Sequence, residues 1–528
     1  MSSSETKPPL RPRCIRSAAA GFVAAAMFLG SADLLARLFS PSSSPLVALG
    51  NTIIAATPPT LQEFVISTFG SDNKLILFIS MGVAGTILAA LIGVLSGRRL
   101  TMGAAAFSVV AAVLAAVVAV RPDVGVTDLV PTLVGAALGL IALITLVLLA
   151  APRQPPREQD QPREQDQPRA QGAPRRAFLA LTAAGAAAAA VSLSLGRSVR
   201  TFGGDVSEAV ARMVLPPPAV RAAAIPESAS FGVDGVAPFI TDNADFYRID
   251  TALAVPELSP EEWTLRIHGL VENDVVISMA ELLELPLEEH HITLTCVSNP
   301  VGGDLLGTAS WLGYPVRELL RRAAPLPEAD MVLSQSVDGF TASTPLEALT
   351  DERDSLVAVG MNGEPLPAEH GFPARLVVPG LYGYVSATKW VVDLEVTRFD
   401  EQTAYWTDRG WDEEAPILVA SRIDVPRPLQ TLPAGEVVIA GSAWAQTSGI
   451  EAVEVQVDGG PWEPAELASE VSEDTWRQWR FVVADAEPGR HWAAVRAVSA
   501  DGDVQTEERR DPIPNAATGH HRIDFTVE

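Results

Sequence analysis

Four long apolar runs in the first 150 residues constrain this chain more than any other feature. They cover about 17–39, 75–96, 101–120 and 129–150 and are rich in Ala, Gly and Ser. Each approaches the roughly 20 apolar residues that an α-helix needs to cross a bilayer. Small side chains also let helices approach closely in lipid. The sequence therefore predicts a four-helix membrane region over residues 1–150.

Basic residues set the expected orientation of these helices. Lys7, Arg11 and Arg16 precede the first run, and Arg98-Arg99 separates the second from the third. Because Lys and Arg accumulate on the cytoplasmic side of a membrane, both ends of the region should be cytoplasmic.

Two further segments follow the apolar runs. Residues 151–176 contain Pro-Arg-Glu-Gln-Asp-Gln twice in succession, a composition that cannot form a core and predicts a disordered cytoplasmic linker. Arg175-Arg176 then precedes the Ala-rich run 177–196. This run is either a twin-arginine-like export signal or a fifth transmembrane helix with ordinary flanking arginines. In both cases it directs the rest of the chain to the extracytoplasmic side. Residues 197–234, rich in Pro and Ala, read as a linker.

Charge and cysteine content exclude several classes of protein. The net charge is −26, and most acidic residues follow residue 200, which argues against a nucleic-acid partner. The only two cysteines, Cys14 and Cys296, lie far apart in the sequence. A disulfide framework or an iron–sulfur cluster is therefore excluded.

Cys296 follows the strand-like run Ile292–Thr295 and precedes Asn299-Pro300 and Gly302-Gly303. A cysteine at the end of a strand, where the chain turns into a loop, can present a thiolate to a ligand. The alternative is a small buried apolar side chain.

Three motifs around and after Cys296 resemble the sulfite oxidase family of molybdopterin-dependent oxidoreductases. They are Thr293–Cys296, Met361–Pro367, and His370–Gly380 followed by Lys389-Trp390. The resemblance covers about 235–528. It implies a molybdopterin-binding α+β domain over residues 235–410, in which Cys296 is the catalytic residue and the ligand of molybdenum.

The same resemblance implies a set of residues that contact the pterin cofactor: Asn243, Phe246, Tyr247, Arg248, Asp338, His370, Arg375 and Lys389. Arg375 and Lys389 are isolated bases in apolar strands, and such charges need a partner, which a phosphate supplies. Arg248 could instead be a surface arginine beside two packing aromatic residues. Asp338 could simply serve the turn Val337-Asp338-Gly339.

Residues 411–528 show short alternating strands with turn signals such as Asp458-Gly459. This pattern predicts an immunoglobulin-like β-sandwich. The family uses this domain for dimerisation, so a homodimer is expected by resemblance.

Together these features predict a membrane-anchored, extracytoplasmic molybdenum oxidoreductase that transfers an oxygen atom. Two positions depart from sulfite oxidases, which place an arginine where this chain has Val301 and a tyrosine where it has Val359. The lost charge-assisted bonds point away from sulfite, toward another small sulfur compound or an N- or S-oxide. All histidines lie outside the apolar runs, so electrons require a separate redox partner, a cytochrome or a quinone-linked protein. The alternative function is a non-catalytic pterin-fold module for binding or assembly on the membrane surface.

Overall fold

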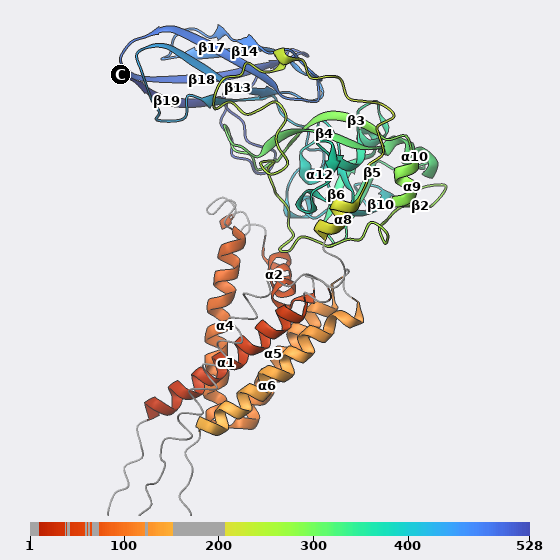
Figure 1. The fold of residues 1–528 in the computed structure, drawn as a ribbon, viewed down its shortest axis with the longest axis vertical. Helices are drawn as coiled ribbons and strands as arrows, with labels where there is room; N and C mark the ends of the chain where they lie inside the picture. The colour runs from red at the N-terminus through yellow and green to blue at the C-terminus, as the bar shows by residue number, and fades with distance from the viewer. Residues whose placement is uncertain are drawn as a thin grey trace, which may run out of the picture. The chain divides into compact units, whose positions relative to one another are not determined.

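The computed structural model describes two compact units, each considered by itself (Figure 1). One unit comprises residues 1–205 with 252–257, and the other comprises 206–251 with 258–528. The described residues, apart from a few single positions, are 10–36, 43–58, 73–121, 125–150 and 206–528. The predicted linker 151–176 and the predicted fifth helix 177–196 lie outside them.

The first unit is helical and contains the elements α1 (Leu10–Ala36), α2 (Pro45–Ala56), α4 (Asn73–Arg98), α5 (Leu100–Ala119), η3 (Val126–Leu129) and α6 (Val130–Ala150). By length and composition, four segments are able to cross a membrane: Cys14–Ala36, Lys74–Arg98, Leu100–Ala119 and Val126–Ala150. They coincide with the four runs found in the sequence. The short apolar helix α2 was not anticipated, because 12 residues fall below the length that a span requires.

Glycine allows α1 and α4 to touch. A Cβ atom on Gly21 would lie 2.1 Å from the carbonyl oxygen of Ala89, and one on Gly93 would lie 2.1 Å from that of Ser17. Only a residue without a side chain fits at either position, which is the close helix packing that small residues favour in lipid.

Two sheets and several short helices form the first part of the second unit, from residue 206 to about 410. One sheet has the order β2-β1-β10-β5-β6, with β1 and β10 parallel, and the other has the order β3-β4-β7-β8, with β9 also paired to β7. The strands are β1 (Thr264–Gly269), β2 (Val275–Ser278), β3 (Glu288–Thr295), β4 (Leu306–Pro315), β5 (Met331–Ser336), β6 (Thr341–Pro345), β7 (Leu356–Met361), β8 (Glu364–Pro365), β9 (Arg375–Val377) and β10 (Val391–Thr397). The helices are α8 (Val206–Arg212), η4 (Glu227–Ala229), α9 (Met279–Glu284), α10 (Val316–Ala323), α11 (Leu346–Thr350), η5 (Ala368–His370), α12 (Gly383–Ser386) and η6 (Thr407–Arg409).

Local sequence explains two of these helices. Ser278 and Glu281 form a capping box at the start of α9, in which each side chain accepts the other residue's backbone N–H. Helix α10 buries Val316, Leu319 and Leu320 on one face and carries arginines on the other.

The segment predicted as a linker over 197–234 contains structure from residue 206 onward. Helix α8 lies within it, and its residues Val206, Ala209 and Val210 pack against the apolar core beneath β3, β4 and β7. Three apolar residues on a short helix suffice to dock it on a preformed core, and the prolines that follow obscured this signal in the sequence.

The C-terminal part, from about residue 411, is built from two sheets that share one core (Figure 1). Their orders are β11-β13-β17-β16 and β12-β19-β18-β14-β15. The strands are β11 (Ala420–Val425), β12 (Thr431–Leu432), β13 (Gly435–Trp444), β14 (Ile450–Val457), β15 (Glu463–Pro464), β16 (Glu466–Leu467), β17 (Arg477–Ala486), β18 (Gly489–Ser499) and β19 (His521–Val527). A two-sheet packing agrees with the expected sandwich, while its immunoglobulin-like class stays a prediction.

The C-terminal part bonds directly to the end of β3, the strand that leads to Cys296. The backbone N–H of Thr293 donates to the carbonyl of Asp474 over 3.0 Å, and the N–H of Trp476 donates to the Thr293 hydroxyl over 2.8 Å. The Gln446 amide donates to the carbonyls of both Thr293 and Asp474. The strand end is therefore fixed by both parts of this unit.

Asp474 carries an electrostatic cost at this junction. Its side chain is buried, and its Oδ1 has no hydrogen-bond partner among the described residues. Burial, with the neighbouring acids Asp354 and Glu473, raises the pKa of Asp474 to about 7. The folded protein therefore holds a proton that the unfolded chain releases near pH 4.

We predict that Asp474→Asn raises the melting temperature, and by more at pH 8 than at pH 5. The stability supplied by the neutral carboxyl is present at low pH and is lost as the pH rises through about 7. The uncharged amide removes this loss. Scanning calorimetry of the purified full chain measures the effect, with the exposed Asp485→Asn as control. A gain that is equal at both pH values would contradict the prediction.

Candidate functional site

Cys296 lies at the mouth of a short closed loop between β3 and β4. Its N–H donates to the carbonyl of Leu305 over 2.9 Å, and its carbonyl accepts from the N–H of Asn299 over 3.0 Å. The Asn299 side-chain oxygen accepts from the N–H of Leu305, which closes the loop from inside. Gly302 has a φ of +78°, and a Cβ atom there would lie 2.3 Å from the ring of His521 in the C-terminal part. The loop is thus held rigidly and needs glycine at this turn.

The Cys296 thiol is nearly buried, with 9% of the residue exposed. Its Sγ atom lies 2.9 Å from the Ser298 hydroxyl. Burial raises the pKa of the thiol, while the Ser298 hydrogen bond and the charge of Lys389 lower it. The residue is neither fully packed in hydrocarbon nor freely exposed.

Three predicted cofactor residues reach this neighbourhood from successive elements. His370 ends η5, Arg375 begins β9, and Lys389 lies two residues before β10. Gly371, with a φ of +111°, links the first two; a Cβ atom there would lie 3.0 Å from Cβ of Arg375 and 3.1 Å from Cβ of Lys389. The glycine lets the three basic residues pack closely, and all three are buried.

Arg375 is held by carbonyl groups and an aromatic ring rather than by an acid. Its guanidinium donates to the carbonyls of His370, Leu376 and Ala387 over 3.1–3.4 Å and lies 5.1 Å from the centre of the Trp311 ring. Among the described residues it has no ion pair. Burial lowers its pKa to about 10, so the group stays positive at neutral pH.

Lys389 shares one carboxylate with Arg248. Its Nζ donates to Asp250 Oδ2 over 3.1 Å and to the carbonyl of Glu369 over 3.0 Å, while Nε of Arg248 donates to the same Asp250 oxygen over 2.9 Å. Burial lowers the pKa of Lys389 to about 8. Arg248 is more exposed and reaches the cluster only through Asp250. The sequence did not single out Asp250, because its partner Lys389 lies 139 positions away.

His370 connects the cluster to the predicted segment Asn243–Arg248. Its Nε2 lies 3.1 Å from the carbonyl of Asn243, and its ring meets that of Phe246 edge-on, while Asn362 donates to the Asn243 side chain over 2.8 Å. The Nδ1 atom of His370 is buried without a partner among the described residues. Burial and the charges of Arg375 and Lys389 lower the pKa of His370 to about 4, so the ring is neutral.

Tyr247 lies close to both Cys296 and Arg375. Its pKa is raised by burial and by the charge of Cys296, and is lowered by Arg375. Asp338 behaves differently: its Oδ1 accepts from the N–H of Phe340 in its own turn over 3.2 Å. The structure thus brings seven of the predicted cofactor residues into one neighbourhood and shows Asp338 in a turn hydrogen bond, so its cofactor role stays a prediction.

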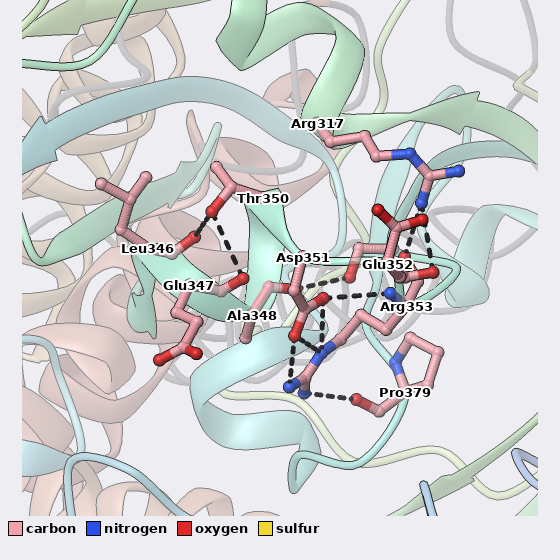
Figure 2. A network of polar contacts seen from close by, with 10 residues as sticks. Arg317, Leu346, Glu347, Ala348, Thr350, Asp351, Glu352, Arg353 and Pro379 are labelled. Carbon is pink, nitrogen blue, oxygen red and sulfur yellow. Dashed lines mark hydrogen bonds and ion pairs between the residues drawn. The ribbon is translucent and has the colours of Figure 1, made fainter.

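Tyr382, from the glycine-rich segment after β9, also approaches Cys296, whose charge raises its pKa. A polar network fixes the start of this segment (Figure 2). Arg353 is clamped by the Asp351 carboxylate and donates to the carbonyl of Pro379 over 3.2 Å. Farther on, the N–H of Tyr382 donates to the carbonyl of Ala415 over 3.0 Å. The backbone that carries the Tyr382 ring is therefore held both before and at this residue.

A small cleft, with a cavity volume of about 30 Å³, opens beside Cys296. Its walls come from the loop after β3, from Tyr382 and from the C-terminal part, where Trp444 and Thr518 contribute. His370, Arg375 and Lys389 are outside this lining. Cys296 is thus next to a cleft and also close to a buried basic cluster.

The basic cluster fits an anionic group. Arg248, Arg375 and Lys389 bring three positive charges, whereas Asp250 is the carboxylate that pairs with two of them. Burying an unneutralised cation costs several kcal/mol. The orphaned Nδ1 of His370 adds a free polar atom within the cluster. The buried hydroxyl of Thr295, the residue before Cys296, also lacks a partner among the described residues. A phosphate-bearing cofactor would satisfy these groups.

Comparisons with known proteins agree with this chemistry. The family described as "Oxidoreductase molybdopterin binding domain" matches residues 252–406. Sulfite oxidase of Gallus gallus is 31% identical over 299 residues, which cover 48% of this chain and 61% of that protein. Human mitochondrial sulfite oxidase is 31% identical over 290 residues, covering 46% and 53%. The chain therefore spans little more than half the length of these relatives.

Two bacterial proteins are also similar. The uncharacterized oxidoreductase YuiH of Bacillus subtilis is 32% identical over 150 residues, which cover 28% of this chain and 72% of that protein. The solved sulfane dehydrogenase SoxCD of Paracoccus pantotrophus shows 25% identity and a TM-score of 0.49, covering 56% of this chain and 84% of that one.

These matches identify the class as molybdopterin-dependent oxidoreductases, whose cofactor is molybdenum bound to molybdopterin. Within this class, the chain belongs to the sulfite oxidase family.

We predict that Arg375→Met lowers the cofactor content of the purified protein about 10-fold or more. Hydrogen bonds to charged groups contribute roughly 1.5–3 kcal/mol, and methionine fills the space without donating any. Molybdenum analysis and fluorescence of the oxidised pterin measure the change. Arg398→Met, at an exposed arginine paired with Asp400, is the matched control and should retain the cofactor. Full cofactor content in Arg375→Met would exclude this residue as a cofactor contact.

Proposed function

We propose that this chain is a membrane-anchored, extracytoplasmic molybdenum oxidoreductase that transfers an oxygen atom to or from a small sulfur compound or an N- or S-oxide. The observation that carries the proposal is a nearly buried cysteine beside a buried cluster of under-neutralised cations. The family match supplies the class of cofactor.

In this proposal Cys296 ligates molybdenum through its thiolate. Burial alone favours the protonated thiol, and coordination to a metal reverses that preference because a bound thiol is deprotonated. The closed loop from 296 to 305 holds the sulfur in place, so little conformational entropy remains to be lost when the ligand bond forms.

Arg375, Lys389 and His370 would hold the anionic part of the pterin. Arg375 offers a rigid fork of donors, Lys389 offers a positive charge, and the neutral His370 offers its buried Nδ1. Tyr247 and Arg248 would border the same group. Once bound, the cofactor supplies two-electron oxygen-atom transfer, and the protein supplies orientation and electrostatics.

The anchor and the location follow from the helical unit. Its four candidate spans are apolar enough for a bilayer, and the basic residues near them favour cytoplasmic ends. A crossing by residues 177–196 would then bring the catalytic part outside. Electrons would pass to or from a separate cytochrome or quinone-linked protein, and a homodimer would form through the C-terminal part.

The central test replaces Cys296 by serine. We expect wild-type protein from a cofactor-competent host to contain stoichiometric molybdenum and to turn over at least one compound among sulfite, S-oxides and N-oxides in a dye-linked assay. Cys296→Ser should lose more than ~100-fold of that activity, because even outer-shell changes at metal sites cost about 10–100-fold. Wild-type protein without molybdenum would favour the non-catalytic module instead.

A labelling experiment tests the location. With Cys14 replaced by serine and Cys296 buried, a cysteine introduced at the exposed Glu436 becomes the one accessible thiol in the sequence. We expect a membrane-impermeant maleimide to label Glu436→Cys in intact spheroplasts. Wild-type Cys14 should be labelled only after lysis. Protection of the introduced cysteine until lysis would put the catalytic part in the cytoplasm.

A further inference from the structure

The cleft beside Cys296 has an uncharged wall. Its lining contains no Asp, Glu, His, Lys or Arg among the described residues. Polar character comes from hydroxyl and amide side chains, and apolar character from Val301, Val419 and the Trp444 ring. This composition differs sharply from the basic cluster near the other side of the same cysteine.

Three of the charged or titratable groups behind the wall are engaged or neutral, and a fourth, Arg509, packs against Gly519 and is exposed to solvent. Arg510 donates to the Thr518 hydroxyl over 3.1 Å, and Arg422 pairs with Asp424 over 2.6 Å while donating to the Gly303 carbonyl. Burial and nearby arginines lower the pKa of His521 to about 4, which leaves that ring neutral. An anion in the cleft would therefore lose hydration without gaining a free counter-charge from Arg510, Arg422 or His521.

Most polar atoms of the wall are also occupied. The Gln505 oxygen accepts from the Ser421 hydroxyl and the Ala497 N–H, and its amide nitrogen donates to the Gly519 carbonyl. The Thr518 hydroxyl donates to the Glu508 carbonyl. These bonds build the wall and leave little for a ligand.

Two hydroxyls of the wall still have a donor to offer. One is Thr295, whose buried hydroxyl has no partner among the described residues. The other is Tyr382. Its hydroxyl oxygen accepts from the Leu418 N–H over a long 3.4 Å, and its proton has no acceptor among the described residues. Burial raises its pKa to about 12, so the phenol keeps that proton at working pH. It lines the cleft together with Cys296, and its ring is fixed by the segment that Arg353 and Ala415 anchor. A hydroxyl donor that is held in place beside Cys296 and has no acceptor can bind an oxygen atom of a substrate.

We propose that the cleft binds an uncharged S-oxide or N-oxide, or the corresponding uncharged product, and that Tyr382 donates a hydrogen bond to its oxygen. The inference rests on the proposed oxygen-atom transfer and narrows its substrate to neutral molecules. In this inference Tyr382 supplies the phenol hydroxyl that sulfite oxidases carry at the position of Val359. The inference also assigns to Val301 a role in selectivity, since an arginine there would bring the missing counter-charge.

The test uses the full chain, purified in detergent with its cofactor. Methyl phenyl sulfoxide and trimethylamine N-oxide are the neutral probes, and sulfite is the anionic one. Calorimetry gives each Kd without turnover. Steady-state assays follow reduction of the sulfoxide to the thioether and water, with the two electrons taken from reduced methyl viologen. The molybdenum content of every sample is measured as well, which tests the proposed function separately.

We expect wild-type protein to bind at least one neutral probe more tightly than sulfite. Tyr382→Phe keeps the ring and loses the donor, so Kd and KM for that probe should rise about 3- to 10-fold at unchanged molybdenum content. Val301→Arg should reverse the preference toward sulfite, whereas Val301→Leu, which adds bulk without charge, should not.

Opposite results would overturn the inference in distinguishable ways. Molybdenum-loaded protein that prefers sulfite, or Tyr382→Phe with unchanged Kd and KM, would refute the neutral substrate or the role of Tyr382 while the oxidoreductase stands. Wild-type protein that contains no molybdenum would refute the proposed function and this inference with it.

Discussion

The site depends on positive charge that the protein buries without neutralising it. Arg375 lies in an apolar sheet with carbonyl groups and the Trp311 ring around it, and no described carboxylate pairs with it. Cation–π contact contributes roughly 0.5–2 kcal/mol, whereas the effective cost of burying an ion is several kcal/mol. The contacts within the protein therefore do not fully compensate the charge, and an anionic cofactor would supply what is missing.

The C-terminal part belongs to the construction of the site. Trp476 and Gln446 bond to the end of β3, Arg422 bonds to the carbonyl of Gly303, and His521 packs against Gly302. The loop that carries Cys296 is thus shaped from both sides. A substitution in the C-terminal sheets can therefore change the cysteine's surroundings without touching the basic cluster.

Sequence reasoning succeeded where the relevant signal is local. The four apolar runs, the strand that ends at Cys296, and the basic residues His370, Arg375 and Lys389 each stand in a short pattern that alone constrains its environment. It did not reveal the Lys389–Asp250 pair, or the meeting of Tyr382 with Trp444 beside Cys296, because such contacts depend on tertiary packing across long stretches of chain. Asp338 as a cofactor contact stays a prediction, since the hydrogen bond that the structure shows belongs to its own turn.

Cys296 lies between an uncharged cleft and a basic cluster, and this separation would keep substrate and cofactor from competing for the same charges. In the proposed function, substrate and cofactor would both approach the same sulfur, and an oxyanion substrate would be attracted to the cations proposed to hold the cofactor. A cleft with an uncharged lining removes that attraction, because a neutral molecule gains little from Arg375 or Lys389 and can still accept a hydrogen bond from Tyr382. Val301 in place of an arginine is consistent with this division, since a guanidinium in the cleft wall would compete for the same anions as the basic cluster.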